Sequence, residues 1–411
     1  TDIGISSLTT YQGFVDKEAR FTTGQIDNQS QSGSTSGEIV IDGDVTVSSA
    51  TTFTSGPQHL TVTDTFTLPS GDTNSRELKP TAGSLRFNQD FATLEFYTGN
   101  NWATVNTFTE MQNSPGNRGR GVMGGRTSSP VQEDVIGFIN IATRGNEQNF
   151  GDLTEVTQYP ANGATSSSIR GLTMGGSGPA YKDVISYITI ASEGNAIDFG
   201  NLTDARHYGA GMSSSTRAIV AGGYDGSGEV NVIDYVEIAT LGNAVDFGDT
   251  NVARRNNSGC ASPTRGIFAG GLTPSLLSDI QFITIAAKGN STKFGDLTIT
   301  RQGSGGGSNS IRGLFAGGSS PFTNVIEYVT IQSEGNASDF GDLTQNKRYL
   351  PVPTSCTRAV FAGGYESPNK INIIDSVEIA TTGNAVDFGD MLMHTNGAST
   401  MSDSHGGLGG F

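Results

Sequence analysis

The four histidines are the side chains best suited to acid–base or metal chemistry, but their spacing supports neither. His59, His207, His394 and His405 do not recur in register with one another, and no His-x-x-x-His pair is present to bind a metal ion. No Gly-x-Ser-x-Gly motif supports a serine hydrolase triad. His207 is interpreted as an ordinary strand or loop residue. We therefore predict no catalytic residue, no metal, no cofactor and no enzymatic activity.

Three short motifs are similar to ligand-binding loops but lack essential parts. The glycine-rich run 303–309 is not followed by the Gly-Lys-Ser/Thr of a phosphate loop, so a flexible connection is the preferred interpretation. Asp225–Glu229 and Asp42–Asp44 each offer oxygens that could contact calcium, but neither has the full alternating ligand set. Turns are favoured at both places.

Two polar positions recur at a regular spacing and would form rings if the copies are equivalent. One is an arginine: Arg120, Arg170, Arg217, Arg265, Arg312 and Arg358. The other is an acid or amide: Asp152, Asn201, Asp249, Asp296, Asp342 and Asp390. The arginines could bind an anion or a sugar acid around a central channel, or pair with carboxylates and carbonyls of their own or the next copy. The structural role is preferred, because packing alone would repeat one group in every copy and buried charges need partners.

These positions belong to a unit that occurs six times between residues 120 and 390. Each copy has a Gly-Gly pair, at 124/125, 175/176, 222/223, 270/271, 317/318 and 363/364. Each also has a phenylalanine before a glycine, spaced 46 to 49 residues from the next: Phe150, Phe199, Phe247, Phe294, Phe340 and Phe388. So constant a period indicates one supersecondary unit copied in tandem.

Each copy reads as four strands. An apolar strand such as 358–362 ends in Gly-Gly, a β-branched strand such as 325–331 follows, and a Gly-Asn turn leads to a third strand at the phenylalanine. A Ser/Gly/Asn-rich stretch such as 301–310 carries the fourth strand before the next arginine. Four strands in about 47 residues match one blade of a β-propeller.

The two ends of the array predict one further blade. The C-terminus, 405–411, aligns with 359–365 and so starts a seventh unit, while 94–102 supplies a strand, a Gly-Asn turn and an aromatic anchor at Trp102. We therefore expect an all-β protein with a propeller of about seven four-stranded blades, the seventh closed by both termini.

The loops after the Gly-Gly pairs differ between copies and are expected to gather on one face. Loops on a rigid scaffold commonly bind ligands, and these contain the Tyr, Ser, Asn and Gly that suit adaptable polar contact. The candidate ligand-facing residues are Tyr181, Tyr224, Asp225, Leu276, Tyr365 and Asn369.

The first 90 residues have a different character. The polar run 25–37 reads as a linker, and 38–47 and 60–68 alternate apolar and polar residues like strands. Such thin strands need partners from another copy or another protein. The expected domains are 1–37, an attachment segment and linker; 38–90, a β-rich stalk or adaptor; and 91–411, the propeller.

Two resemblances extend this interpretation over about residues 38–411. The repeat resembles a kelch-type blade with Phe in place of the usual Trp, a departure that keeps kelch functions from being transferred. The segment 80–88, followed by 94–97 and Asn101-Trp102, resembles one common in tailed-bacteriophage fibre and appendage proteins. The sequence pattern of the repeat, best seen in 379–390, resembles repeat arrays in virion proteins of phages that infect marine and freshwater bacteria, cyanobacteria among them.

Composition excludes several partners. The formal net charge of −16 argues against binding to a nucleic-acid backbone. Cys260 and Cys356 imply no disulfide framework and are interpreted as buried thiols. No secretory signal or membrane-spanning apolar run is visible, so we expect no membrane insertion.

The resemblances imply a virion structural protein, such as a tail fibre, made in the host cytoplasm. Residues 1–90 would attach to other virion proteins, with a homo-oligomer expected and a homotrimer among its forms. The propeller would bind a host-surface glycan or protein. The alternatives are a capsid, neck or fibre decoration without receptor binding, and a host-envelope glycan hydrolase, which would need two suitably spaced carboxylates.

Overall fold

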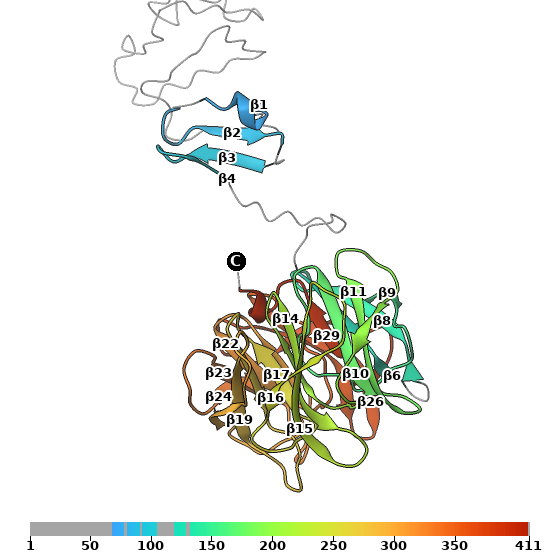
Figure 1. The fold of residues 1–411 in the computed structure, drawn as a ribbon. Helices are drawn as coiled ribbons and strands as arrows, with labels where there is room; N and C mark the ends of the chain where they lie inside the picture. The colour runs from blue at the N-terminus through green and yellow to red at the C-terminus, as the bar shows by residue number, and fades with distance from the viewer. Residues whose placement is uncertain (1–67, 78–79, 91–92, 105–118, 129–131, 410–411) are drawn as a thin grey trace, which may run out of the picture. The chain divides into compact units, whose positions relative to one another are not determined.

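The computed structural model describes residues 68–77, 80–90, 93–104, 119–128 and 132–409 (Figure 1). These residues form small, mostly antiparallel sheets with no α-helix among them, which confirms the predicted all-β class. The chain divides into two compact units, Thr1–Thr109 and Glu110–Phe411. The attachment segment 1–37 and the strands expected at 38–47 lie outside the described residues, as do nearly all of those at 60–68.

One sheet makes up the described part of the first unit. Its order is β1-β2-β3-β4, formed by Ser70–Gly71, Leu85–Asn88, Thr93–Tyr97 and Trp102–Thr104. On its buried face Glu95, fully enclosed, forms an ion pair with Arg76 and accepts a hydrogen bond from Asn88 at 2.9 Å. Because β3 pairs with β2, the expected boundary at residue 91 cuts through a sheet; the compact units divide near residue 109 instead.

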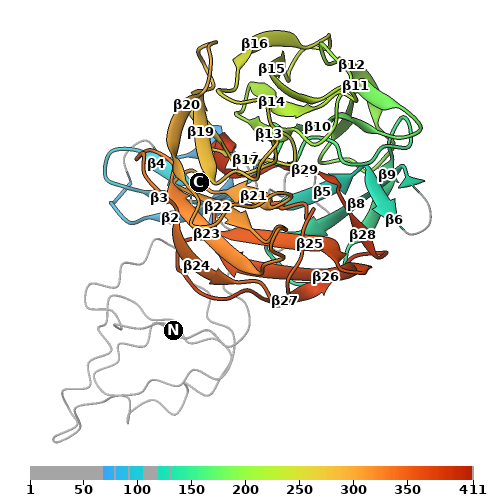
Figure 2. The same cartoon turned by 90° about the horizontal axis from the view of Figure 1, so that it is seen from below.

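The six copies of the repeat form six sheets in the second unit (Figure 2). The four-stranded ones are β29-β5-β8-β9 (Ser399–Ser402, Arg120–Gly124, Val135–Asn140, Gln148–Asp152), β13–β16 (Ala210–Ser213, Arg217–Tyr224, Glu229–Glu237, Val245–Asp249), β17–β20 (Ser258–Ala261, Arg265–Ala269, Asp279–Thr284, Thr292–Asp296) and β21–β24 (Gly305–Ser308, Arg312–Ala316, Val325–Thr330, Ser338–Asp342). The three-stranded ones are β10–β12 (Arg170–Ser177, Tyr181–Thr189, Ile197–Asn201) and β25–β27 (Arg358–Glu366, Asn369–Glu378, Val386–Asp390), each with a fourth segment joined by an isolated bridge, Ser166↔Gly171 or Thr354↔Ala359. A small separate sheet combines β28, β6 and β7 (Thr395–Asn396, Arg126–Ser128, Gln132–Glu133).

The Ser/Gly-rich strand belongs to the following sheet rather than to the one before it. For example, β21 pairs with β22 through Gly305↔Ala316 and Ser308↔Gly313. The sequence pattern placed this strand fourth in its own copy, but the hydrogen-bonded partner is the arginine strand that comes next. The innermost strand of each sheet therefore comes from the Ser/Gly-rich segment of the preceding copy.

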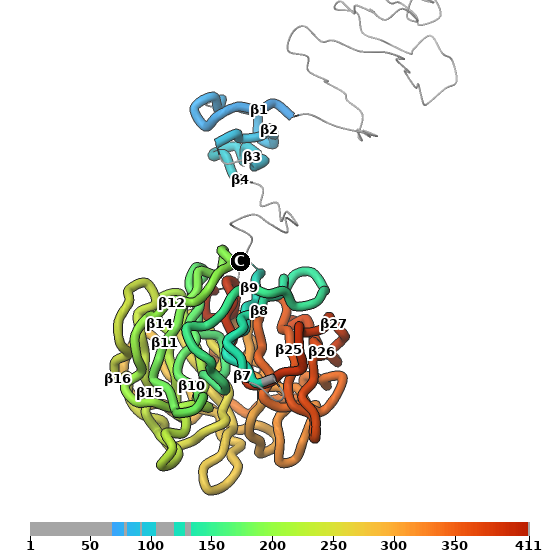
Figure 3. Tube along the Cα trace, turned by 90° about the vertical axis from the view of Figure 1, so that its right-hand side faces the viewer, coloured from blue at the N-terminus to red at the C-terminus, as the bar shows by residue number. Residues whose placement is uncertain are grey.

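This shift explains how the two ends of the array meet, and it corrects the expected seventh blade. The last Ser/Gly-rich strand, β29, has no arginine strand after it and pairs with the first one, β5, through Ser399↔Gly124 and Ser402↔Gly121. Figure 3 shows the sheets of the first and last copies as neighbours. The segment 94–102 pairs inside the first unit's sheet, and Gly406–Leu408 form a 3-10 turn rather than a strand.

The Gly-Asn motif joins each sheet to the one before it. The amide of Gly194 donates to the carbonyl of Phe150 at 2.9 Å, and the Asn195 side chain accepts from the amide of Asp152 at 3.1 Å. The same bonds recur through the array, and the amide of Gly145 donates to Phe388 at 3.0 Å, linking the first copy to the last. The hydrogen bonds between the six sheets therefore run in a cycle.

The core lies in layers between neighbouring sheets. All six phenylalanines of the repeat are 2–4% exposed and pack there with Leu, Ile and Val from two adjacent copies. Burying a large aromatic side chain stabilises the fold by about 2–3 kcal/mol, so the repeated Phe is an anchor for each layer.

Buried ion pairs form a second repeated feature. Lys347 and Asp375 are fully buried with 2.9 Å between Nζ and Oδ2, and Arg206 and Asp234 lie at the same register three copies away, also 2.9 Å apart. Between the first and second copies the corresponding residues are both uncharged, Thr157 and Ser186. Arg254 has Gln281 at this register and pairs instead with Asp279 at 2.6 Å, as expected where an unpaired buried charge is costly.

Candidate functional site

Six residues at one position of the repeat form a closed cycle of backbone hydrogen bonds. Each precedes the innermost strand of its sheet: Tyr159, Tyr208, Asn256, Gly303, Tyr349 and Gly397. The amide of each donates to the carbonyl of the member from the preceding copy at 2.7–3.1 Å, and Tyr159 closes the cycle onto Gly397. All six have a left-handed backbone, with φ between 51° and 69°.

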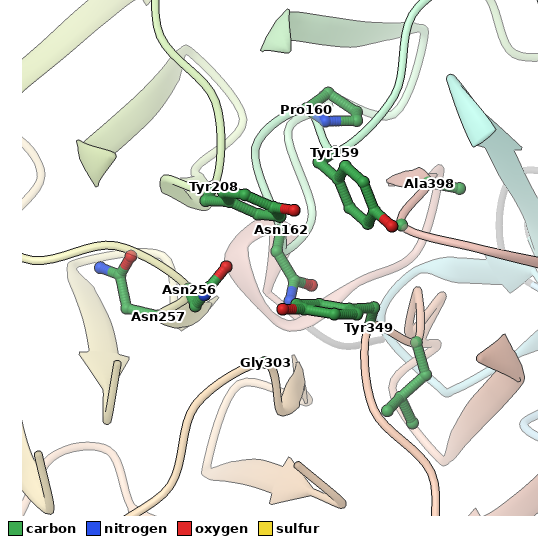
Figure 4. Close-up of a pocket in the computed structure, with 11 residues that line it drawn as sticks. Tyr159, Pro160, Asn162, Tyr208, Asn256, Asn257, Gly303, Tyr349 and Ala398 are labelled. Carbon is green, nitrogen blue, oxygen red and sulfur yellow. The ribbon is translucent and has the colours of Figure 1, made fainter. Parts of the chain in front are cut away.

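Three tyrosines hold this conformation although Asn and Gly suit it better. A left-handed backbone costs a residue with a Cβ roughly 1–2 kcal/mol, and such strain is characteristic of functional sites. The ring centroids of Tyr159 and Tyr208 lie 4.7 Å apart, and those of Tyr208 and Tyr349 lie 5.8 Å apart in a stacked arrangement. The rings surround a common space in Figure 4, and their hydroxyls make no hydrogen bond within the described part of the chain.

The space between the rings is a shallow hollow that encloses about 20 Å³ and opens to solvent. We call it the tyrosine hollow; it is lined by Tyr159, Pro160, Asn162, Tyr208, Asn256, Asn257, Gly303, Tyr349, Leu350, Gly397 and Ala398. None of these side chains is acidic. The carboxamide oxygens of Asn162, Asn256 and Asn257 are buried and have no hydrogen-bond partner among the described residues.

Close backbone packing lies beneath the hollow. Asn162 donates to the carbonyl of Ser304 at 2.8 Å across the centre of the array. Gly163, next along the chain, has φ +128°, and a Cβ there would lie 2.0 Å from the carbonyl oxygen of Gly211 and 2.6 Å from that of Gly259. Only glycine allows the innermost strands to approach so closely here.

An aromatic group continues from the hollow to the rim. The imidazole of His207 lies 4.1 Å from the Tyr208 ring, 4.9 Å from Tyr181 and 5.8 Å from Tyr224, centroid to centroid. The guanidinium of Arg255 lies 4.6 Å from the Tyr224 ring centroid and pairs with Glu229 at 3.3 Å. Tyr181 is 41% exposed, so this group reaches the surface.

A second group surrounds Arg348. Its guanidinium lies 4.8 Å from the Tyr349 ring centroid, 5.0 Å from Tyr365 and 5.1 Å from Phe322. It donates to the Ser319 hydroxyl at 3.1 Å, and no carboxylate lies within ion-pair distance of it in the described parts of the chain. This arginine is held by aromatic faces rather than by an acid.

Burial sets the protonation states at the hollow. It lowers the pKa of His207 to about 4, with a further lowering by Arg255, so the imidazole is neutral near neutral pH. Burial raises the pKa of Tyr208 and Tyr349, with Arg348 and Arg255 acting in the opposite direction. The hollow thus presents neutral phenol groups that can both donate and accept hydrogen bonds.

The structure brings only some of the six predicted loop residues to this site. Tyr181 and Tyr224 come together around His207, and Tyr365 joins Arg348. The Asp225 carboxylate accepts bonds from the amides of Ser227 and Gly228, which closes its own turn. Leu276 forms a bridge with Leu272, and Asn369 begins β26 opposite Glu366.

The two repeated polar positions make contacts between sheets. Arg217 donates to the carbonyl of Ile285 in the next copy at 3.0 Å, and its guanidinium lies 4.8 Å from the Tyr235 ring centroid. All six repeated arginines donate to a backbone carbonyl of the following copy, with Arg358 reaching Ile141 of the first. At the other repeated position, which begins with Asp152, the side chain is not the group that joins the sheets. The backbone amide of each residue there donates a hydrogen bond to the side-chain oxygen of an Asn in the next copy.

Searches of family models and of curated proteins find no match for this chain. In the described ranges, three or more His, Cys, Asp or Glu side chains nowhere gather as they would around a metal ion. Those ranges also contain no helix with the length and apolar character to span a membrane. The site is therefore interpreted from its own geometry.

Sequence reasoning missed the tyrosine hollow, although a signal was present. When the copies are aligned, Tyr159, Tyr208 and Tyr349 share a position with Asn256 and with two glycines. Asn and Gly together mark a left-handed backbone. Tyrosine at such a position is unusual and could have identified the site.

Proposed function

We propose that this chain is a structural protein of a tailed-phage particle whose six sheets close as a β-propeller and bind a host-surface glycan through the tyrosine hollow. The observation that carries the binding proposal is the set of three strained tyrosines around one space. Tyrosine faces and hydroxyls suit the apolar faces and hydroxyl groups of a sugar ring. Asn and Gly occupy the same position in the other three copies, so the backbone conformation itself does not call for tyrosine.

The virion assignment depends on the phage-like segments near residues 80–102 and 379–390. It is supported by the division of the chain into a small β unit and a larger one. In this proposal residues 1–90 attach to the particle, as an oligomer, and the larger unit is displayed. The cycle of hydrogen bonds between sheets supports a propeller, since a closed array presents one common face.

Staining tests this proposal. The purified full chain, fluorescently labelled, is applied to a panel of marine and freshwater bacteria that includes cyanobacteria. We expect it to stain some strains, and free glycan extracted from those strains should compete. Staining that protease treatment of the cells removes would indicate a protein receptor instead. A folded chain that stains no strain would favour a decoration role.

A further inference from the structure

The surroundings of the tyrosine hollow differ in charge from the rest of the chain. The chain has 40 acidic and 24 basic residues. The position just before the cycle, which forms the hollow's rim, contains no acid: Gln158, His207, Arg255, Gln302, Arg348 and Asn396. The lining contains no acid either, and the Glu229 carboxylate near the rim is paired with Arg255.

The two rim arginines are in different states. Arg255 has Glu229 as an ion-pair partner at 3.3 Å. Arg348 has none in the described residues; its Nε is buried without a hydrogen-bond partner, and only Nη1 is used, by Ser319. Its position 4.8 Å from the Tyr349 ring centroid places a positive charge beside the hollow.

The geometry points to an anionic sugar as the ligand of the tyrosine hollow, with the sugar ring against the tyrosines and its acidic group on Arg348. This inference depends on the proposed glycan binding and names its substrate class. Arginine presents parallel N–H donors that match a carboxylate or a sulfate. The hydroxyls of Tyr159, Tyr208 and Tyr349, which lie around the same space, would exchange hydrogen bonds with the ring hydroxyls of the sugar.

Ligand-observed NMR titrations of the full chain test this inference. The probes are methyl glucuronide, methyl glucoside and glucose 6-sulfate. We expect the glucuronide or the sulfate to bind roughly tenfold more tightly than the glucoside, because a charged hydrogen bond adds that much. Preference for one acidic probe over the other distinguishes a carboxylate from a sulfate ligand.

Variants assign the preference to Arg348. Arg348→Gln should bind the acidic and neutral sugars equally, whereas Arg348→Lys should keep part of the preference. Arg255→Gln is the matched control and should change the preference for acidic sugars little, since Glu229 already neutralises Arg255. An unchanged thermal transition would show that the variants fold.

Two outcomes would overturn the inference, and only the second would also overturn the proposed glycan binding. If glucuronide, sulfate and glucoside bind equally well, the ligand is not selected by charge, although glycan binding stands. If none of the sugars binds and no glycan extract competes for cell staining, the proposed function fails with it.

Discussion

Removing the acid of one buried ion pair should destabilise the array far more than removing both charges. Lys347 is fully enclosed, and its ammonium contacts Asp375 Oδ2 at 2.9 Å and the carbonyls of Phe361 and Ile373 at 3.1 and 3.4 Å. Burial lowers the pKa of Lys347, and Asp375 opposes that shift. Asp375→Ser therefore leaves a buried ammonium without its counter-charge.

The expected loss follows from the distance. At 2.9 Å two charges attract by about 6 kcal/mol at an effective dielectric constant of about 20. Part of this is offset by the desolvation of both groups, and breaking such pairs costs about 3–5 kcal/mol. The double variant Lys347→Met/Asp375→Ser removes both charges, as at Thr157 and Ser186 between the first and second copies. We expect it to regain at least about 2 kcal/mol of the loss.

Calorimetry is the appropriate assay. The single tryptophan, Trp102, belongs to the first unit, so its fluorescence would not report on the array. We expect Asp375→Ser to lower the Tm of the array by roughly 6–15 °C, and the double variant by less than half of that. Equal losses in the single and double variants would refute the reasoning, because they would mean that packing rather than charge sets the cost.

Two further predictions concern other buried positions. Gly163→Ala should destabilise the array by more than about 3 kcal/mol, because its Cβ would overlap the Gly211 carbonyl; a melting temperature equal to wild type would contradict the close packing at the centre. His405 should make stability depend on pH, because burial lowers its pKa to about 4 from an ordinary 6.5. That contribution is complete above pH 6.5 and falls by up to about 3 kcal/mol as the pH drops to 4, since the unfolded chain then binds the extra proton. Urea unfolding between pH 6.5 and 4 should show a smaller decrease in the free energy of unfolding for His405→Asn than for wild type. Equal decreases in the two proteins would show that His405 is not the source of the pH dependence.

Local features of the repeat were predictable from the sequence, whereas its long-range pairings were not. The buried Phe and the β-branched strand follow from residue type and period. The pairing of Ser399–Ser402 with Arg120–Gly124 joins the two ends of the array, and no local pattern encodes such a partner. Assigning the Ser/Gly-rich strand to the wrong sheet therefore produced a seventh blade that the strand pairings exclude.

The site was only partly predictable for a related reason. Of the predicted loop residues, Tyr181 and Tyr224 contact His207 and Tyr365 contacts Arg348, so three of the six lie near the hollow. The tyrosines of the hollow occupy a backbone conformation that tyrosine disfavours, so propensity argued against finding them there. Buried pairs such as Arg206–Asp234 were hidden as well, since their members lie in different copies.

The most direct test of the site replaces two tyrosines by the residue that the array already uses at the same position. In Tyr208→Asn/Tyr349→Asn, relief of the left-handed strain, about 1–2 kcal/mol per residue, offsets much of the cost of losing four ring pairs, about 0.5–1.5 kcal/mol each. The variant should therefore melt within a few degrees of wild type. Tyr328→Phe, a structural aromatic beneath Arg312, serves as the control.

The decisive measurement is the affinity of these two variants and of wild type for the glycan of a stained strain. Our proposal predicts that the double asparagine variant remains folded but loses at least tenfold in affinity, while Tyr328→Phe keeps the wild-type affinity. Wild-type affinity in a folded double variant would contradict the claim that the tyrosine hollow binds the host surface.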